Sequence, residues 1–555
     1  MMYTSDSLIE IIEESFKHNW NRPALSDYKG ITLYYRDVAR RVAKMHIVFR
    51  ESGVKQGDKI AICSKNQSNW AVVFLSCLTY GAVPVPILHE FKPSNIEHIV
   101  NHSDSMILFA GSIILEGLTL SHMPNVSTVI CLDDFSLVQT KDKAVYLAME
   151  HLNELFGKAY PKVFGPDCIS YRRESDPDEM AMINYTSGTS GFSKGVMIPY
   201  RALRSNVLFA YKVMSSVDEN SNVVSILPSA HMYGMMFEFL YEMTVGAHVH
   251  FLTRLPSPSV IVKAFEEIKP KIIISVPLVI EKIYKNRLQP FLSTPGVRFL
   301  LRLPIADKKI KTQINDTLTS SFGGAFEEVI IGGAAFNKEA DSFFNSIGFK
   351  YTVGYGMTEC APIIAYADWK EKRVGSCGYA APRMQIRIDS DKPRTVPGEI
   401  QVKGDNTMLG YYKNEIATRD AFTEDGWMRT GDLGILDKDG FLYIKGRSKN
   451  MILGPSGQNI YPEEIESIIN NMPYVVESLV IEDDGKMIAL IYPDLEGASR
   501  DGLSTAAQIE AKMKENIAIV NEEMPNYSKI SGVKIMPEEF EKTPKRSIKR
   551  YIYQN

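Results

Sequence analysis

A short stretch near the middle of the chain concentrates hydroxyl side chains, glycines and a lysine. It covers residues 182–200 and reads MINYTSGTSGFSKGVMIPY. Glycines let the backbone come close to an anion, N–H and hydroxyl groups donate hydrogen bonds to it, and a lysine adds positive charge. Serine- and glycine-rich tracts are also common as flexible linkers. The composition leaves both interpretations open, but the apolar segments on either side favour a phosphate-binding loop.

This stretch differs from the nucleotide-binding pattern G-x-x-x-x-G-K-[ST]. Gly188 and Gly191 are too close together for that pattern, and Lys194 is not followed by serine or threonine. A phosphate loop at this place would therefore be of another type.

Four further stretches carry residue types that could do chemistry. They are IGGAAF at 331–336, VGYGMTEC at 353–360, WMRTGDLGILDKDGFLYIKGRSKNMI at 427–452 and GQNIYPEEIE at 457–466. The first has paired glycines that let a ligand lie flat against the backbone. The second combines an aromatic ring, a hydroxyl and a carboxylate, the third places Asp432 in a turn, and the fourth leads into a helix that starts with proline. Each of them alone fits an ordinary turn or core segment equally well.

Length and composition indicate the number of domains and the class of protein that contain these stretches. A chain of 555 residues is too long for one hydrophobic core and predicts two to four domains. A hydrophobic content of 45% with 23% charged residues is typical of a soluble globular protein. The 62 basic and 66 acidic residues leave a net charge of -4, which gives no reason to expect a nucleic-acid partner.

Cysteines and the N-terminus indicate a cytoplasmic protein. The six cysteines form no CxxC pair and have no metal-ligand spacing to a histidine, so reduced thiols are the simplest interpretation. The beginning, MMYTSDSLIEIIEESF, carries acidic residues where a signal peptide needs basic ones. The most apolar run, residues 71–87, is too short to span a bilayer.

The order of apolar segments predicts an α/β fold. Strand-like runs alternate with helix-period segments over the first four-fifths of the chain, which predicts mostly parallel sheets covered by helices. Residues from roughly 375 to 447 have short alternating strands and frequent Gly/Asp turns, which favours an antiparallel subdomain. Residues 448–555 have the composition of a small α+β domain, so that 1–447 form the N-terminal domain.

Taken together and in this order, the five stretches resemble the adenylate-forming superfamily, which includes acyl-CoA synthetases, aryl-CoA ligases, luciferases and adenylation domains of peptide synthetases. The resemblance extends from LYYRDVARRVA near the start to KTPKRSIKRYIY at the end. Within the superfamily, long-chain fatty acyl-CoA synthetases are the most similar group. The segments that indicate this group are KIIISVPLVIEKIYKNRLQ, the basic insert FLLRLPIADKKIKTQI and IKRYIY.

The resemblance implies a nucleotide site. Residues expected to bind the phosphates of ATP are Thr186, Ser187, Gly188, Thr189, Ser190, Gly191 and Lys194. Residues expected around the adenine are Gly333, Ala334, Tyr355 and Gly356, with the ribose held by Asp432 and Arg447. Thr358 is expected to contact the α-phosphate, while Glu359 and Thr189 are expected to hold Mg²⁺, a hard cation that suits oxygen ligands.

The same resemblance implies the reaction and a moving domain. A carboxylate attacks the α-phosphate of ATP to give an acyl-AMP and pyrophosphate, and the thiol of CoA then displaces AMP. The small C-terminal domain is expected to rotate between the two steps about a hinge at Lys449. The loop around Gly457 is expected to approach CoA, and His231 to gate the acid pocket.

One position departs from the family pattern. The adenylation lysine lies in a PKTxxGKxxR-like motif near the C-terminus, and alignment with EKTPKRSIKRYIY places Ser547 there. A serine cannot bridge a carboxylate and a phosphate as a cation does. Either Lys545 or Lys549 replaces it, or Arg546 supplies the charge, or adenylation is impaired; Lys545 is preferred because it shares a face with position 547 in an extended loop.

The sequence therefore predicts an ATP-dependent ligase that joins a medium- or long-chain fatty acid to CoA. An acyl carrier protein as acceptor is a close variant, and a weakened acyl- or nucleotide-binding protein is the alternative from another class. Peripheral membrane contact is compatible with the chain, and a monomer and a homodimer both stay open.

Overall fold

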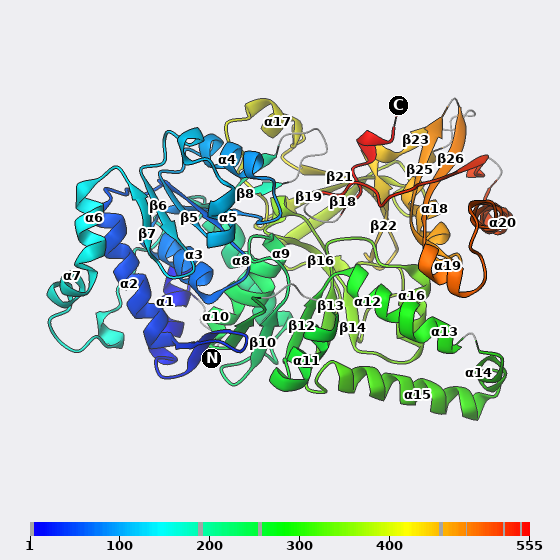
Figure 1. The fold of residues 1–555 in the computed structure, drawn as a ribbon, viewed down its shortest axis with the longest axis horizontal. Helices are drawn as coiled ribbons and strands as arrows, with labels where there is room; N and C mark the ends of the chain where they lie inside the picture. Colours follow the sequence, from blue (N-terminus) through cyan, green and yellow to red (C-terminus); the bar gives the residue numbers. More distant parts are fainter. Residues whose placement is uncertain are drawn as a thin grey trace.

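The computed structural model describes residues 5–186, 193–253, 258–292, 294–453, 459–483, 485–525, 528–543 and 547–554. Figure 1 shows the N-terminal elements at one end of the molecule and the C-terminal ones, β25, β26 and α18 to α20, at the other. The elements that carry the candidate residues lie between them.

The first sheet has the order β4-β3-β5-β6-β7 and is parallel except for β7. Its strands, in that order, are Val83–Ile87, Lys59–Cys63, Ile107–Ala110, Thr128–Cys131 and Leu137–Thr140. Every residue of β4, β5 and β6 is buried, as expected for parallel strands that are covered on both faces. The helices of this region are α2 (Tyr35–Glu51), α3 (Ser68–Tyr80), α4 (Pro93–His102), α5 (Ser112–Gly117), α6 (Lys143–Glu150) and α7 (Leu152–Ala159).

Two further sheets continue the α/β pattern. The sheet β10-β11-β1-β2 consists of Asn222–Ser225, His248–Phe251, Pro23–Asp27 and Thr32–Tyr34. The parallel sheet β12-β13-β14 consists of Ile272–Ser275, Glu328–Ile331 and Tyr351–Val353. Around them lie α8 (Tyr200–Val213), α11 (Pro258–Ile268), α12 (Pro277–Ile283), α13 (Gln289–Leu292), α14 (Pro295–Leu300), α15 (Pro304–Ser321) and α16 (Lys338–Ser346).

Short antiparallel sheets carry most of the candidate residues. One has the order β20-β9-β8, with strands Gly410–Tyr411, Lys194–Pro199 and Met180–Thr186. Another, β15-β16-β17, consists of Tyr355–Gly356, Ile363–Tyr366 and Tyr379–Ala380. The antiparallel sheet expected after about residue 375 is β18-β19-β21-β22, formed by Met384–Asp389, Gly398–Gly404, Met428–Leu436 and Leu442–Arg447, with α17 (Glu415–Asp420) beside it.

The C-terminal residues build a core of their own. The sheet β25-β26-β27 consists of Val475–Asp483, Lys486–Pro493 and Gly532–Ile535, and the hairpin β23-β24 of Ile452–Leu453 and Asn459–Ile460. The helices α18 (Pro462–Ile469), α19 (Leu495–Arg500) and α20 (Ala506–Glu523) complete this part. Ile465, Ile491 and Met513 belong to one buried cluster that includes no residue before Ile452. The helix-covered parallel sheets, the antiparallel subdomain and the α+β C-terminal part that the sequence predicts are thus confirmed.

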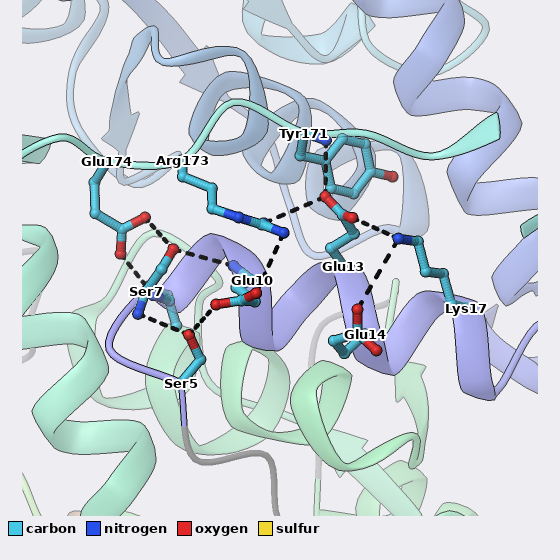
Figure 2. Close-up of polar contacts among 10 residues, drawn as sticks. Ser5, Ser7, Glu10, Glu13, Glu14, Lys17, Tyr171, Arg173 and Glu174 are labelled. Carbon is cyan, nitrogen blue, oxygen red and sulfur yellow. Dashed lines mark hydrogen bonds and ion pairs between the residues drawn. The ribbon is translucent and has the colours of Figure 1, made fainter. Parts of the chain in front are cut away.

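The N-terminal helix is tied to the segment that leads into β8 (Figure 2). Ser7 begins α1 (Leu8–His18) by accepting a hydrogen bond from the Glu10 N–H at 3.2 Å, and its hydroxyl donates to Glu174 at 2.5 Å. Glu13 accepts from the Tyr171 N–H at 2.8 Å and from Lys17 at 2.6 Å. These contacts fix the approach of the chain to the hairpin that carries the candidate phosphate loop.

A π-helical turn, Met236–Leu240, separates α9 (Met232–Met235) from α10 (Tyr241–Val245) and places two carboxyl groups in the core. Glu238 accepts hydrogen bonds from the N–H groups of Ile226 and Leu227 at 3.2 and 3.0 Å. Glu242 is fully buried, and neither of its carboxyl oxygens has a hydrogen-bond partner among the described residues. Burial raises the pKa of Glu242 from 4.5 to about 8, so this side chain is neutral at physiological pH.

None of the described helices combines the length and the apolar character that crossing a bilayer requires.

The buried Glu242 predicts a pH-dependent loss of stability. Between about pH 4.5 and about pH 8 the folded chain holds a proton that the unfolded chain has released. The stabilisation is complete below this window and is lost as the pH rises through it. Glu242→Gln, which stays neutral, should remove this contribution to the slope, at most about 1.4 kcal/mol of unfolding free energy per pH unit within the window.

Thermal unfolding of both proteins at several pH values between about 5 and about 9 measures the effect. The exposed Glu415 on α17 offers the control substitution Glu415→Gln, which should leave the slope unchanged. An equal slope in the parent and in Glu242→Gln would contradict the assignment of the proton to this residue.

Candidate active site

The β8-β9 hairpin places Thr186 directly opposite Lys194, at the end where the connecting loop begins and ends. The loop between the two strands contains Ser187, Gly188, Thr189, Ser190 and Gly191, which lie outside the described residues. The strands hold their alignment because every β8 residue between its two ends is buried. The Lys194 ammonium lies 4.6 Å from the centre of the Tyr411 ring, a distance that suits a cation–π contact.

Strand β20 brings Tyr411 to this hairpin from more than two hundred residues further along the chain. It pairs with β9, with Tyr411 opposite Val196. The Tyr411 hydroxyl donates a hydrogen bond of 2.9 Å to Oε1 of Glu359. Burial, and next the charge of Glu359, raise the pKa of Tyr411 well above its ordinary value, so the hydroxyl keeps its proton. Lys194, Tyr411 and Glu359 therefore form one chain of contacts.

The turn that carries Thr358 and Glu359 is fixed by hydrogen bonds with α8 and by a close backbone approach. It is a 3₁₀ turn, Thr358–Cys360, and both residues are buried. The Asn206 side chain of α8 donates to the carbonyl of Cys360 at 3.3 Å and accepts from the N–H of Ile363 at 3.1 Å. Gly356 lies so close to the carbonyl oxygen of Pro362 that an added Cβ would be 2.3 Å from it. Only glycine fits this approach.

Asp432 lies in a second polar cluster beside the first. The Tyr355 hydroxyl donates to its Oδ2 at 2.6 Å, and Nε of Arg447 lies 2.9 Å from its Oδ1. The pairing of β21 with β22 places Asp432 opposite Arg447. Burial raises the pKa of Asp432, while the charge of Arg447 and the hydrogen bond from Tyr355 act in the opposite direction. More than half of the Arg447 side chain is exposed, so its charge is partly screened by solvent.

The two clusters share one electrostatic environment. The charge of Glu359 raises the pKa of both Asp432 and Arg447. Glu463 of α18 contributes to both groups in the same sense. The structure thus brings together three regions that the sequence separates widely: the hairpin at Lys194, the turn at Glu359 and the strand at Asp432.

Two other candidate regions border this centre. Gly333 and Ala334 follow β13 and are exposed, with Gly333 at a φ of +87°. A Cβ on the preceding Gly332 would lie 3.1 Å from the Tyr233 ring, so that ring packs directly under the glycine pair. His231 begins α9, where its Nδ1 accepts from the N–H of Tyr233 at 3.3 Å.

The predicted hinge lies at the end of β22. Lys449 is in the middle of a 3₁₀ turn, Ser448–Asn450. The Asn450 side chain donates to Glu463 at 2.6 Å, which joins the turn to α18. Gly457 lies outside the described residues.

The C-terminal basic segment forms a short hairpin. Lys542 pairs with Ile548, and the N–H of Thr543 donates to the carbonyl of Ser547 at 2.8 Å. Lys545, the preferred replacement cation, lies outside the described residues. Lys549 is bound to Glu541 at 2.8 Å.

Two lysines act on the Glu541 carboxylate of this hairpin. The hydrogen bond from Lys549 lowers the pKa of Glu541, and the charge of Lys92 at the start of α4 lowers it further.

Sequence reasoning missed Tyr411, although this residue connects the hairpin with Glu359. Its only signal in the sequence is a Gly-Tyr-Tyr run in MLGYYKNE, which has no spacing relation to the other candidate stretches. Asn206, which fixes the Glu359 turn, gave no signal at all.

Comparison with solved structures identifies the fold. An ATP-bound RpMatB-BxBclM chimera superimposes with a TM-score of 0.78 at 21% identity and covers 99% of this chain and 98% of the other. The Bacillus subtilis O-succinylbenzoate coenzyme A synthetase MenE, in complex with ATP and magnesium ion, gives 0.74 at 20% identity, each chain being 98% covered. The architecture is that of an adenylate-forming enzyme.

The sequence comparisons give the family. The AMP-binding enzyme family matches residues 12–412, and the AMP-binding enzyme C-terminal domain matches residues 449–554. The chain belongs to the AMP-binding enzyme family.

Curated relatives include long-chain-fatty-acid–CoA ligases. FadD15 of Mycobacterium bovis is 27% identical over 551 residues, 90% of this chain and 86% of that protein. A long-chain-fatty-acid–CoA ligase from Escherichia coli is 26% identical over 501 residues, 85% of this chain and 82% of that protein.

The close contact at Gly356 predicts that a single methyl group distorts the site. Gly356→Ala should destabilise the fold by about 1–3 kcal/mol, because the added carbon overlaps a backbone oxygen that cannot move independently. Gly354→Ala is the matched control, since its Cβ would meet no atom closer than 3.6 Å. Denaturant unfolding of both variants checks this, and equal stabilities would contradict it.

Proposed function

We propose that this chain is an ATP-dependent ligase that activates a medium- or long-chain fatty acid as an acyl-AMP, with release of pyrophosphate, and transfers the acyl group to CoA. The observation that carries the proposal is that Lys194, Glu359 and Asp432 lie in two adjoining polar clusters that share one electrostatic environment. This arrangement offers a cation for phosphates, a carboxylate for a metal ion and a carboxylate for a sugar at adjoining places. Membership of the AMP-binding enzyme family and the names of the relatives support it.

The nucleotide would lie across the two polar clusters. Asp432 is held by Tyr355 and Arg447, so its carboxylate is fixed in orientation before a ribose arrives. Gly333 and Ala334 are exposed and would line the adenine together with Tyr355 and Gly356. The phosphates would be bound by the hairpin residues, which are Thr186, Ser187, Gly188, Thr189, Ser190, Gly191 and Lys194.

The residues present fit a magnesium ion that arrives with ATP. Among the described residues, no group of three or more His, Cys, Asp or Glu side chains could hold a metal by itself. Mg²⁺ typically takes one or two carboxylates together with phosphate oxygens, so Glu359 and the Thr189 hydroxyl would suffice. The bound ion would neutralise charge on the phosphates. Tyr411 would orient the Glu359 carboxylate for this role, and Thr358 would contact the α-phosphate.

The acid would enter beside His231. This residue begins the helix that carries Tyr233, and the Tyr233 ring lies under the glycine pair that would line the adenine. The carboxylate end of the substrate would thereby be held near the α-phosphate. The methionines and aromatic rings behind it, among them Met235, Met236 and Phe237, are buried and would suit an apolar chain.

The adenylation cation would come from the C-terminal hairpin. Lys545 is the first candidate. Lys549, bound to Glu541, would have to exchange that contact for the substrate.

The proposed domain division is 1–447 and 448–555, with rotation about Lys449. The separate buried core after residue 452 and the separate family match to residues 449–554 support it. After rotation, the loop around Gly457 would approach the pantetheine arm of CoA.

A second candidate function follows from Ser547. A serine in place of the family lysine would suit a protein that binds an acyl group or a nucleotide but adenylates slowly. An acyl carrier protein in place of CoA is a variant of the first proposal.

An activity assay separates these functions. Purified protein is incubated with MgATP and a panel of carboxylic acids that includes palmitate, with CoA or an acyl carrier protein as acceptor. Release of both pyrophosphate and AMP with a fatty acid supports the ligase. Failure to release AMP with any acid would overturn it, and tight acyl or nucleotide binding without turnover would then favour the second candidate.

The metal role of Glu359 predicts a selective loss of activity. Glu359→Gln should lower kcat by about 10²–10³, the usual cost of removing one group that stabilises transition-state charge. Glu371→Gln is the matched control, because Glu371 also accepts a hydrogen bond from a tyrosine, Tyr379, at 2.9 Å but lies on the surface. Steady-state kinetics over a range of Mg²⁺ concentrations measures the effect. Equal kcat values in both variants would contradict the assignment.

The missing lysine predicts which substitutions affect only the first half-reaction. Lys545→Met should reduce pyrophosphate release by about tenfold or more while transfer from preformed acyl-AMP to CoA continues. Ser547→Lys should restore adenylation in that variant and change the parent little. If adenylation by the parent is impaired, Ser547→Lys alone would instead raise it strongly. Lys549→Met tests whether Lys549, rather than Lys545, supplies the cation.

A further inference from the structure

The β8-β9 hairpin has a second face that turns away from the candidate site. Thr186 pairs with Lys194, and the residue before it, Tyr185, pairs with the next residue of β9. Because successive side chains of a strand point to opposite faces of a sheet, Tyr185 lies on the face away from Lys194. Its pairing partner is Gly195, where an added Cβ would lie only 3.0 Å from Cζ of the Tyr185 ring. The ring therefore lies flat across the hairpin on this second face.

Strand β20 has the same two faces. Tyr411 lies on the side of the candidate site, where its ring contacts Lys194. The N–H of the next residue, Tyr412, donates to the carbonyl of Gly195 at 2.7 Å and continues the pairing of β20 with β9. The Tyr412 side chain points to the opposite face, beside Tyr185.

The C-terminal end of α4 packs against these two tyrosines. Nδ1 of His102, the last residue of α4, lies 2.7 Å from the Tyr185 hydroxyl oxygen, a hydrogen-bond distance. The His102 ring meets the Tyr185 and Tyr412 rings edge-on, with 5.8 and 6.0 Å between ring centres. Two residues further on, Asp104 accepts a hydrogen bond of 2.9 Å from the Tyr412 hydroxyl. Figure 1 shows α4 beside β8, in agreement with these contacts.

The backbone and the charge of Asp104 suit this contact. Its φ of +56° lies in the left-handed region, which aspartate and asparagine adopt more readily than most residues. Lys413 forms an ion pair with Asp104 at 2.7 Å. Burial acts to raise the pKa of the Asp104 carboxyl, but the hydrogen bonds from Lys413 and Tyr412 outweigh it and hold that pKa below its usual value. The carboxylate therefore stays charged and keeps accepting from Tyr412.

We propose that His102 and Asp104 are positioning residues for the phosphate-binding hairpin. His102 acts through Tyr185, which directly precedes the residues assigned to the phosphates, and Asp104 acts through Tyr412, which directly follows Tyr411. The hairpin is held from both faces, by α4 on one and by the contacts of Tyr411 on the other. Its hydrogen-bond donors are thus oriented before the β- and γ-phosphates of ATP arrive.

This inference rests on the proposed function, because that proposal assigns the hairpin to the phosphates of ATP. AMP provides the comparison that isolates the hairpin. It has no β- or γ-phosphate, and its one phosphate is the group assigned to Thr358. Loss of positioning should therefore weaken the binding of MgATP and leave the binding of AMP unchanged.

Isothermal titration calorimetry of the full chain with MgATP and with AMP tests the proposal. Tyr185→Phe and His102→Ala should each weaken MgATP binding by about three- to tenfold, because each removes one hydrogen bond. The double variant should be little worse than either single one, since both remove the same bond. His102→Asn, which keeps a polar atom near the position of Nδ1, should recover most of the affinity. Tyr412→Phe should weaken MgATP binding to a similar extent.

Matched controls change the same residue types elsewhere. His18→Ala alters an exposed histidine that ends α1 as His102 ends α4. Tyr379→Phe removes a surface hydroxyl that, like that of Tyr412, donates to a carboxylate, here Glu371 at 2.9 Å. Both controls should bind MgATP and AMP as the parent does.

Equal MgATP affinity in the parent, Tyr185→Phe and His102→Ala would overturn the proposal, and an unchanged Tyr412→Phe would overturn the role of Asp104. A parallel loss of MgATP and AMP affinity would indicate a general loss of structure and would overturn it too. If the parent binds no MgATP, this inference and the proposed function both fail. If the selective loss is observed but no acid gives pyrophosphate, the ligase proposal fails and the positioning role stands.

Discussion

The hydrogen bond from Tyr411 to Glu359 connects the phosphate-loop hairpin with the rest of the candidate site. It depends on the pairing of the two-residue strand β20 with β9, because this pairing brings Tyr411 beside both Lys194 and Glu359. The turn that holds Glu359 is in turn fixed by Asn206 and by the close approach at Gly356. A rigid carboxylate is thus available before any ligand binds, which lowers the entropic cost of binding a cation there.

The carboxylates of the two adjoining clusters differ in their surroundings. Asp432 is buried, which raises its pKa, but it faces the guanidinium of Arg447 and the hydroxyl of Tyr355. Glu359 accepts from a tyrosine hydroxyl whose proton is retained. The first carboxylate is therefore suited to accept hydrogen bonds from a neutral sugar, and the second to bind a cation.

Elements from both the N-terminal and the C-terminal parts of the chain support the candidate site. Burial of α1 against the segment at Glu174 fixes the strand that leads into the hairpin. Glu463 of α18, in the C-terminal part, acts on the pKa of Asp432 and accepts a hydrogen bond from Asn450 at 2.6 Å.

The sequence by itself determined the alternation of strands and helices, the change to antiparallel strands and the compact C-terminal part, since each follows from local apolar periodicity. It also determined which residue types could bind a nucleotide, through five short motifs in a fixed order. Only the tertiary structure decided that Tyr411 donates to Glu359, and that Asn206 holds the Glu359 turn. The same is true of the hydrogen bond from Tyr355 to Asp432. Their partners lie far apart in the chain, and no local pattern encodes which strands pair.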